Sequence, residues 1–408
     1  MSQTIQKLFD TKKIPQDALE LLENFDKIIQ DIIPANSKQE SALPKQIRDL
    51  SHQMTDERER RRKGYMNEKT ALVAYARYFM WWNLVRLTRL FSNLDFSFLR
   101  DGDICLDIGS GPLTVICALW LSQPALRKKN LVWHAMDISR QALNLGEEIF
   151  LSIAAKTAKA KNSEESKNGN ANENADFLPW KIIRVKDSLG ASIRQKAALL
   201  TCANVFNEIL QSESAPPDAL AKKYSKALFP YLQENASVLL IEPGVPNSAR
   251  FISLMRDAFL RNGFFAAAPC PHQGRCPMDG RRAGKNGASG KWCNFAFETA
   301  DAPKRLLSLS EKSGLPKERA VLSFVFVQKN AGAKKLSEKS EQSESLRIVS
   351  DTIHLAQRGA RGHYACARQG FSLAICPPGK KVESGDLIFD AKEKNERDEK
   401  TNALIFEI

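Results

Sequence analysis

An apolar run that ends in an acid and two glycines is the first stretch of the chain that could bind a ligand. Residues 103–114 read DICLDIGSGPLT and contain Asp107-x-Gly109-x-Gly111, after which residues 114–121 continue as an apolar helical pattern. Glycine lets the backbone approach a ligand closely because it has no Cβ. The N–H groups that begin a helix can bind a ligand, and a nearby acid can accept from a ligand hydroxyl or amine. The pattern therefore predicts the glycine turn of a Rossmann-like sheet.

Two later acids stand at the ends of predicted strands. Asp137 ends the apolar run 131–137, and Asp187 follows the run 181–186. In nucleoside-binding Rossmann sheets an acid at the second strand end accepts from ribose hydroxyls, so we assign Asp137 to the ribose and Asp187 to the adenine end. Thr114 occupies the place of a third glycine, which argues against a dinucleotide site. Asp-x-Gly-x-Gly resembles the first motif of S-adenosylmethionine (SAM) methyltransferases, and a structural turn with both acids as helix caps is the alternative.

A further polar group follows the predicted fourth strand. Residues 197–202 are apolar, and Asn204, Asn207 and Glu208 come directly after them. Methyltransferases have the loop that faces the methyl group at this place, so these three side chains are the candidate catalytic residues. They would serve equally well to cap the start of a helix.

Three cysteines in the second half of the chain could converge on a metal centre. Cys270 and Cys276 lie among prolines and glycines, and Cys293 follows Trp292. Prolines and glycines favour a loop, in which several thiolates can meet. The first two cysteines are farther apart than zinc sites usually allow, whereas iron–sulfur clusters tolerate irregular spacing. The sequence predicts an iron–sulfur cluster, with zinc as the alternative.

The fourth ligand has two candidates, Cys366 and Cys376, of which we choose Cys366. His272 is a weaker stand-in. Basic side chains flank the cysteines, and we expect their charge to lower the thiol pKa values and to offset the charge of a cluster. These side chains are Arg275, Arg281, Arg282, Lys285 and Lys291. The remaining cysteines, Cys105, Cys117 and Cys202, fall in apolar segments and are expected to be buried free thiols.

The order of the elements predicts an α/β fold, in which a Rossmann-like SAM methyltransferase sheet carries a helical N-terminal region and a small β-rich C-terminal appendage. We expect the helical region over residues 1–100 and the SAM-binding domain over residues 101–330, with the cysteine loop at 268–295. A linker at residues 331–345 and the β-rich domain at residues 346–408 follow.

Several segments carry narrower expectations. Residues 18–32 have the spacing of one amphipathic helix, and residues 71–82 are apolar nearly all round, as in a buried helix. A helix is predicted over residues 140–155, followed by a disordered polar insertion at 156–176. The basic run 58–63 is a solvated helix face or a phosphate-facing one. His134 is expected in the core.

Composition narrows the class of protein and its partners. The chain of 408 residues has a net charge of +13, which favours a polyanion such as RNA as partner. Its hydrophobic share of 43% is enough for a sizeable core, and no apolar run is long enough to cross a bilayer. The first residues lack the apolar core of a signal peptide. This lack of an export signal, together with the eight cysteines, indicates a reducing compartment. We expect a cytoplasmic monomer that does not bind membranes.

Four motifs together resemble the methyltransferase-like small-ribosomal-subunit assembly-factor family of mitochondria and bacteria. They are the LDIGSGP of residues 106–112, the NEIL of residues 207–210, the IEPGVP of residues 241–246, and the APCPH of residues 268–272 with the later Cys-Pro and Trp-Cys-Asn-Phe. A basic insert at residues 281–290, and Asn294, depart from the family pattern. The resemblance implies a SAM-binding Rossmann domain, four cysteines that carry a four-iron four-sulfur cluster, and a role on the small ribosomal subunit and its rRNA.

Two functions follow from these expectations. The first is SAM-dependent methyl transfer to rRNA in ribosome assembly or translation, by a protein that carries an iron–sulfur cluster. The second is a non-catalytic assembly or RNA-binding factor that keeps SAM and the cluster as structural ligands. A radical SAM enzyme is disfavoured, because the sequence has no Cys-x3-Cys-x2-Cys triplet.

Overall fold

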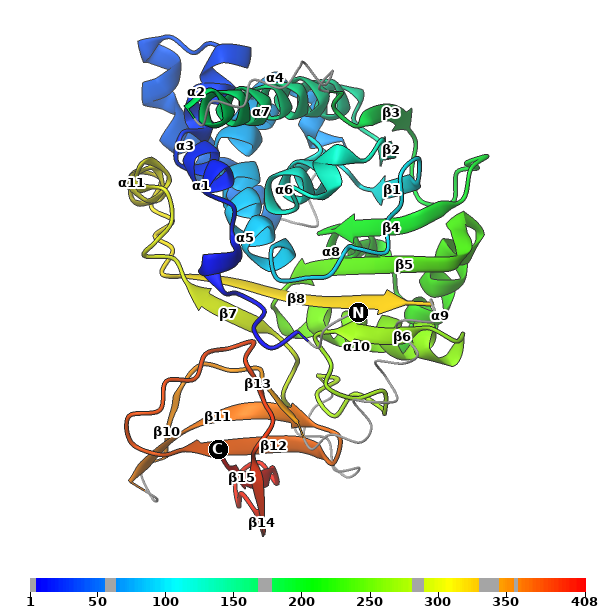
Figure 1. Cartoon of the computed structure of the whole chain (residues 1–408), viewed down its shortest axis with the longest axis vertical. Coiled ribbons are helices and arrows are strands. Elements are labelled where there is room, and N and C mark those ends of the chain that lie inside the picture. The colour runs from blue at the N-terminus through cyan, green and yellow to red at the C-terminus, as the bar shows by residue number, and fades with distance from the viewer. Residues whose placement is uncertain (1–4, 56–63, 168–177, 281–289, 330–344, 356–358) are drawn as a thin grey trace. The chain divides into compact units, whose positions relative to one another are not determined.

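The computed structural model describes residues 5–55, 64–167, 178–280, 290–329, 345–355 and 359–408 (Figure 1). The chain divides into two compact units, each of which gathers segments that are distant in sequence. The first unit comprises Met1–Phe9, Ser192–Glu298 and Arg319–Ile408, and the second comprises Asp10–Ala191 and Thr299–Glu318. The basic run 58–63 lies outside the described residues.

The second unit contains three parallel strands joined by helices. Its elements in order are β1 (Ile104–Ile108), α6 (Thr114–Ser122), the short helix η5 (Leu126–Lys128), β2 (Val132–Asp137), α7 (Arg140–Lys167) and β3 (Lys181–Lys186). Strand β2 pairs in parallel with both β1 and β3. Parallel neighbours need a crossover connection, which α6 and α7 supply. The carboxyl ends of β1, β2 and β3 therefore lie at one edge, as the predicted Rossmann-like α/β fold requires.

The N-terminal helices pack on these crossover helices. They are η1 (Thr11–Lys13), α1 (Gln16–Glu23), α2 (Phe25–Ile32), α3 (Ser37–Thr55), η3 (Tyr65–Asn67), α4 (Lys69–Ala74), the π-helical η4 (Tyr75–Met80) and α5 (Trp81–Phe91), joined by the later α11 (Lys304–Lys312). Helices α1 and α5 contact α6, and α1 and α2 contact α7. No helix in the described ranges is both long enough and apolar enough to span a bilayer.

Two helix predictions for this region met different outcomes. Residues 18–32 form two helices rather than one, because Asn24 leaves helical geometry with φ −108° and ψ 18°. The apolar stretch 71–82 is helical and buried as expected, and its one charge is accommodated. The guanidinium of Arg77 donates to Gln30 Oε1 at 2.6 Å and to the carbonyl of Ile33 at 2.8 Å.

Helix α7 is longer than predicted. It does not end near residue 155 but continues to Lys167, so the first half of the supposed insertion is helical. The segment is rich in alanine, lysine and glutamate, which favour helix in solvent. A lack of apolar residues argued against a buried element there, not against a solvated helix. The remainder of the predicted insertion, residues 168–176, lies outside the described part of the chain.

The first unit holds the other half of the α/β pattern. Its elements are β4 (Ala197–Ala203), α8 (Phe206–Ile209), η6 (Leu210–Ser212), α9 (Pro217–Leu228), η7 (Phe229–Tyr231), β5 (Leu232–Pro243), α10 (Pro246–Arg261), β6 (Phe265–Ala268), β7 (Phe295–Glu298) and β8 (Arg319–Gln328). Strands β4 and β5 are parallel, and β8 runs antiparallel to β5, β6 and β7. Helix α10 packs on β5 and β8. The long connection from β6 to β7 is the cysteine loop.

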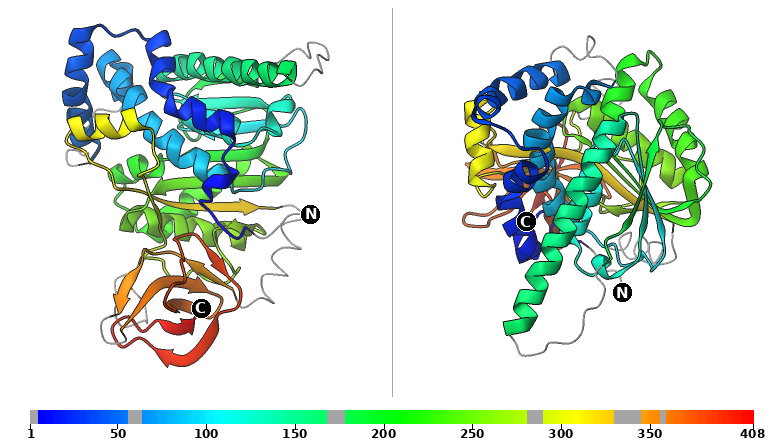
Figure 2. Two further views of the ribbon diagram at one scale, coloured as in Figure 1. Left: turned by 60° about the vertical axis from the view of Figure 1, so that its left-hand side comes forward. Right: turned by 90° about the horizontal axis from the view of Figure 1, so that it is seen from above.

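A second sheet completes the first unit and confirms the β-rich C-terminal appendage. It comprises β9 (Leu346–Ile348), β10 (Ile353–Leu355), β11 (Ala360–Ala367), β12 (Gly370–Cys376), β13 (Leu387–Ile388), β14 (Lys392–Arg397) and β15 (Leu404–Glu407). The order is β13-β9-β11-β12-β15-β14, with β10 beside β11. Figure 2 shows the sheet curling on itself. Leu346, Ile348, Cys376 and Phe406 belong to its buried core.

Candidate functional site

The turn after β1 has the backbone geometry that the glycines permit. Gly109 and Gly111 have φ values of 67° and 52°, a region that residues with a Cβ rarely adopt. Between them, Ser110 donates its backbone N–H to the carbonyl of Met136 at 3.0 Å, which anchors the turn to β2. The turn then leads into α6, and the first N–H groups of this helix point back toward the turn.

Two buried acids brace this turn. Asp107 is fully buried and accepts from the hydroxyl of Ser110 at 2.6 Å. Asp137 accepts from the backbone N–H of Gly111 at 2.9 Å and from that of Ser139 at 2.8 Å. Burial raises the pKa of Asp137, and these two N–H groups partly offset the rise. Each of its oxygens retains acceptor capacity for a further partner such as a ribose hydroxyl.

Helix α7 and the segment at η3 press against the same turn. A Cβ added to Gly146 of α7 would lie 2.4 Å from the carbonyl carbon of Pro112, so only glycine fits there. From η3, the side-chain oxygen of Asn67 accepts from the Ser139 hydroxyl at 2.8 Å. The methyl group of Met66 lies 3.7 Å from the place of a Cβ on Gly111. Neither Met66 nor Asn67 belongs to a strand-end motif, so the sequence carries no signal for their place at the turn.

Asp187 lies at the neighbouring strand end, with an exposed side chain. Its backbone N–H donates to the carbonyl of Asp137 at 3.2 Å, and its carboxylate accepts from the backbone N–H of Ser188 at 2.8 Å. The second unit therefore holds all five predicted cofactor residues at the carboxyl ends of β1, β2 and β3. Asp187 is also committed to the local turn, as the alternative interpretation expected.

In the first unit, the segment after β4 is held by Glu242. This buried carboxylate, near the end of β5, accepts from the backbone N–H groups of Val205 at 3.0 Å, Phe206 at 2.8 Å and Asn207 at 3.1 Å. Burial raises the pKa of Glu242 to about 8, and the three N–H groups offset only part of that rise. Glu242 therefore positions the start of α8. The IEPGVP motif at residues 241–246 contains Glu242, but the sequence assigned no role to this acid.

The candidate catalytic residues differ in their surroundings. Asn204 has a left-handed backbone, with φ 58°, and its N–H donates to the carbonyl of Ile241 at 2.8 Å. Glu208 lies in the first turn of α8. The side-chain oxygen of Asn207 is buried and has no hydrogen-bond partner among the residues that the structure describes. Asn207 is thus the one of the three whose buried oxygen is left for a ligand group to satisfy.

The cysteine loop and β11 bring four thiols to one cavity. Cys270, Cys276 and Cys293 line it together with Cys366, whereas Cys376 belongs to the core of the C-terminal sheet. The free volume between them is small, about 10 Å³. In the described ranges, no three histidine, cysteine or acidic side chains form a group ready to hold a metal ion. The ring nitrogen Nε2 of His272 lies 3.2 Å from the sulfur of Cys366.

The charge around these thiols differs from the expectation. Burial raises the pKa of Cys276 to about 11 and holds the pKa values of Cys293 and Cys366 well above their usual value. Arg256 lowers all three, but burial outweighs it, so the predicted lowering of the thiol pKa values was wrong for them. Thiols of this kind bind a metal only with release of their protons.

The basic side chains expected around the cysteines do not supply that charge. Arg275 points to solvent with 69% of its side chain exposed and pairs with Asp279 at 3.7 Å. Lys291 lies over the ring of Tyr364, 4.7 Å from its centroid. Arg281, Arg282 and Lys285 lie outside the described residues. The buried positive groups at the cavity are Arg256 of α10 and Arg347 of β9, which line it. Neither was singled out, because each is an isolated arginine without a local motif.

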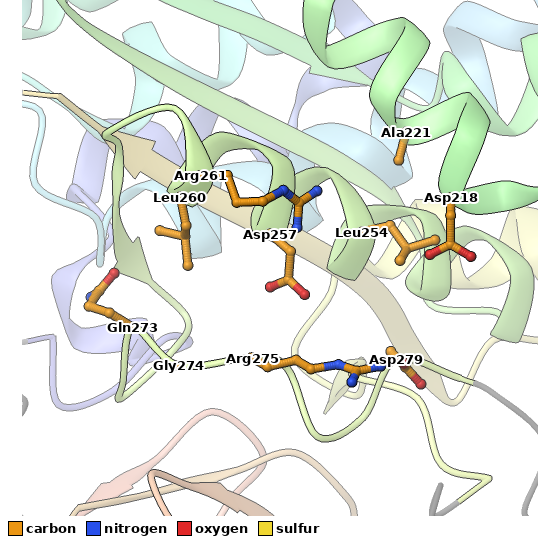
Figure 3. Close-up of a pocket in the computed structure, with 10 residues that line it drawn as sticks. All are labelled: Asp218, Ala221, Leu254, Asp257, Leu260, Arg261, Gln273, Gly274, Arg275 and Asp279. Atoms are coloured by element: carbon orange, nitrogen blue, oxygen red, sulfur yellow. Dashed lines mark ion pairs between the residues drawn. The ribbon is translucent and has the colours of Figure 1, made fainter. Parts of the chain in front are cut away.

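A wider, open pocket adjoins the cysteine loop (Figure 3). It has a volume of about 390 Å³ and lies between α9, α10 and the loop. Acidic and basic side chains alternate along its walls, with Asp218, Asp257 and Arg261 on the helices and Arg275 and Asp279 on the loop. Both signs of charge line this pocket, which suits a polar ligand more than a simple ion.

Comparison with known proteins gives a family match. The model of the family described as "Mitochondrial small ribosomal subunit Rsm22" matches residues 98–360. A search of curated proteins returned no match.

Similar solved structures include three methyltransferases. A methyltransferase from Pyrococcus furiosus shares 12% identity over 57% of this chain and 78% of its own, with a TM-score of 0.27. A SAM-dependent methyltransferase from Aquifex aeolicus shares 13% identity over 57% of this chain and 85% of its own, with a TM-score of 0.26. The plantazolicin methyltransferase BpumL in complex with SAH shares 11% identity over 77% of this chain and 99% of its own, with a TM-score of 0.31.

Proposed function

This chain belongs to the Rsm22 family, whose model covers residues 98–360, and from that premise we propose that it is a SAM-dependent methyltransferase acting on the small ribosomal subunit and its rRNA. The family description names the mitochondrial small ribosomal subunit. The chain's net charge of +13 suits a partner made largely of RNA. We further propose a cytoplasmic, monomeric protein, as expected from its composition.

The braced glycine turn carries this proposal. Gly109 and Gly111 adopt φ values that open the backbone to a close ligand, and Asp137 fixes the turn through the N–H of Gly111. The remaining acceptor capacity of Asp137 suits ribose hydroxyls, and Asp107 is buried beneath the turn. We assign the methionine part of SAM to the turn with Asp107, the ribose to Asp137, and the adenine end to Asp187.

The protein has little covalent chemistry to perform in this reaction. SAM supplies a methyl group that is already activated by its sulfonium, so orienting the nucleophile provides most of the rate. Asn207 is the candidate for that role, since its buried side-chain oxygen can accept from an amine or hydroxyl. Glu242 holds the backbone on which Asn207 stands. Asn204 and Glu208 remain secondary candidates.

At the cysteine cavity we propose a four-iron four-sulfur cluster held by Cys270, Cys276, Cys293 and Cys366. The donor set fits, because four sulfurs from the cysteine loop and strand β11 line one cavity with two buried arginines. The free volume between the thiols is about 10 Å³, so the four sulfurs must stand farther apart when a centre is bound. Zinc is the alternative occupant, since four thiolates also suit Zn²⁺. We expect the bound centre to fix the cysteine loop in place rather than to transfer electrons.

Methyl incorporation into immature small subunits tests the enzyme. Purified protein, labelled SAM and immature subunits should yield labelled rRNA, and Asp107→Ala should abolish the label. Asn207→Ala should lower the rate while leaving SAM bound. The enzyme proposal fails if subunits at several stages of assembly acquire no label from the wild-type protein.

A non-catalytic factor is the second candidate. One observation favours it: the turn is already held by its own hydrogen bonds, from the Gly111 N–H to Asp137 and from the Ser110 hydroxyl to Asp107. A site that keeps SAM as a structural ligand needs such a fixed turn. In that case SAM binds and subunits mature, but no methyl group appears on rRNA. Subunit maturation measured with Asn207→Ala separates the two, because a non-catalytic factor does not need the Asn207 side chain for transfer.

A further inference from the structure

Two arginines are buried at the cysteine cavity, although arginine is seldom found inside a protein unless it is paired. Arg256 is 2% exposed and Arg347 is 3% exposed. Both line the cavity that holds the four thiols. An isolated buried charge is costly, so each guanidinium needs a compensating partner.

Arg256 contacts the cavity directly. Its Nε donates to the sulfur of Cys270 at 3.0 Å, and its Nη2 donates to the carbonyl of His272 at 2.8 Å. Its Nη1 donates to Asp257 at 2.7 Å. The Asp257 side chain is 18% exposed and points into the open pocket of Figure 3. Asp257 therefore offsets part of the charge of the guanidinium on one side, while Nε on its other side faces the buried sulfur of Cys270.

Arg347 is held by neutral groups. It donates to the backbone carbonyls of Pro269 at 2.8 Å, Gly385 at 2.7 Å and Ile5 at 2.8 Å. Carbonyls fix the direction of a guanidinium but do not neutralise it. The nearby acid Asp386 shares its charge with Lys7 at 3.9 Å. The three carbonyls belong to the N-terminal segment, the cysteine loop and the turn before β13, so Arg347 also joins these segments.

The charge of a four-thiolate centre matches this arrangement. Four thiolates around either a four-iron four-sulfur core or Zn²⁺ leave a net charge of about −2. We propose that Arg256 and Arg347 are the counter-charges of this centre and that Arg256 is in addition a positioning residue, which orients Cys270 through its N–H···S hydrogen bond. This inference rests on the cysteine site proposed above and extends it to residues outside the ligand set.

Hydrogen bonds and positive charge at a thiolate have a measurable effect. They stabilise the more negative, reduced state of a cluster and so raise its reduction potential. Partners of metal ligands typically change metal retention by roughly 10–100-fold when removed. Arg256 should influence both properties, because it touches a sulfur. Arg347 should influence retention as well but shift the potential less than Arg256, because it brings positive charge to the cavity without a hydrogen bond to sulfur.

The test compares Arg256→Met, Arg256→Lys and Arg347→Met with the wild type after anaerobic reconstitution. Iron, sulfide and zinc per chain, the rate of iron loss to a chelator, and the reduction potential are measured. Arg77→Met serves as the matched control, since Arg77 is also buried, at 8% exposure, but lies in the other unit and bonds to Gln30 and Ile33. If the wild type binds zinc, chelator competition for zinc replaces the potential.

We expect metal loss to be about 10–100-fold faster in both methionine variants and unchanged in Arg77→Met. Arg256→Lys should retain the metal better than Arg256→Met, with a shifted potential, because the charge stays while the fork geometry is lost. Metal retention and potential equal to wild type in Arg256→Met and Arg347→Met overturn the proposal. If either methionine variant does not fold, Arg256→Lys is the deciding variant. A reduction potential or zinc affinity equal to that of the wild type in Arg256→Lys would then overturn the proposal. A wild type without any metal overturns instead the cysteine site itself.

Discussion

Gly111 donates its backbone N–H to the carboxylate of Asp137 across 2.9 Å, which ties the turn after β1 to the end of β2. Because the donor is a backbone group, this contact depends on the backbone conformation at position 111, where φ is 52°, and not on a side chain there. It leaves Asp137 buried but with acceptor capacity for one more partner per oxygen. The turn is thus shaped before any ligand arrives, and ligand binding has little ordering entropy to overcome.

Gly146→Ala tests the contact between α7 and this turn. Helix propensity alone would make alanine more stable than glycine by about 1 kcal/mol. The new Cβ, however, would lie 2.4 Å from the carbonyl carbon of Pro112. We therefore expect a loss of about 1–3 kcal/mol in the free energy of unfolding, measured by urea denaturation, together with weaker SAM binding. An increase in stability would show that α7 does not press on the turn.

Glu242 should make stability depend on pH. Its folded pKa of about 8 exceeds the ordinary value of 4.5 because of burial. Between these values the unfolded chain has lost the proton while the folded chain keeps it, so the free energy of unfolding falls as pH rises. The contribution is fully present below pH 4.5 and is lost as pH rises through about 8.

Glu242→Gln removes this titration. The difference in melting temperature between Glu242→Gln and the wild type should shift in favour of the variant from pH 5 to pH 8. Glu234→Gln is the matched control, because Glu234 is on the same strand with an exposed side chain, and its difference should stay constant. A parallel pH profile for Glu242→Gln and wild type would contradict the buried carboxyl.

Cys366→Ala and Cys376→Ala distinguish the candidates for the fourth ligand. Cys366 lines the cavity with the three loop cysteines, whereas Cys376 packs in the core of the C-terminal sheet. We expect metal per chain to fall at least about tenfold in Cys366→Ala. Cys376→Ala should keep wild-type metal and lose only core packing. The opposite pattern would assign the ligand to Cys376.

Much of the fold was predictable because strands and turns carry local signals. The glycine turn, both acids at the strand ends and the β-rich C-terminal region follow from apolar runs bounded by glycine and acid. Helix ends were less predictable. Asn24 divides a continuous amphipathic pattern, and α7 continues through residues whose polarity suggested disorder.

The partners of the candidate site were largely not predictable. Arg256 and Arg347 reach the cysteines through contacts between distant segments, and neither carries a local motif. Glu242 belongs to the IEPGVP motif, but its hydrogen bonds with the backbone N–H groups of Val205, Phe206 and Asn207 depend on the pairing of β4 with β5. Nor does the sequence show that burial outweighs positive charge at the thiols, since burial is a property of the folded chain.

Binding of SAM to the purified full-length protein tests the central claim most directly. Isothermal titration calorimetry should show one SAM per chain, with affinity reduced at least about tenfold in Asp107→Ala. Asp101→Ala is the control, because Asp101 lies just before β1, at the opposite end of the strand, and bonds to Asn130; it should bind as the wild type does. No heat of SAM binding to the wild-type protein, or equal binding by Asp107→Ala, would contradict the site.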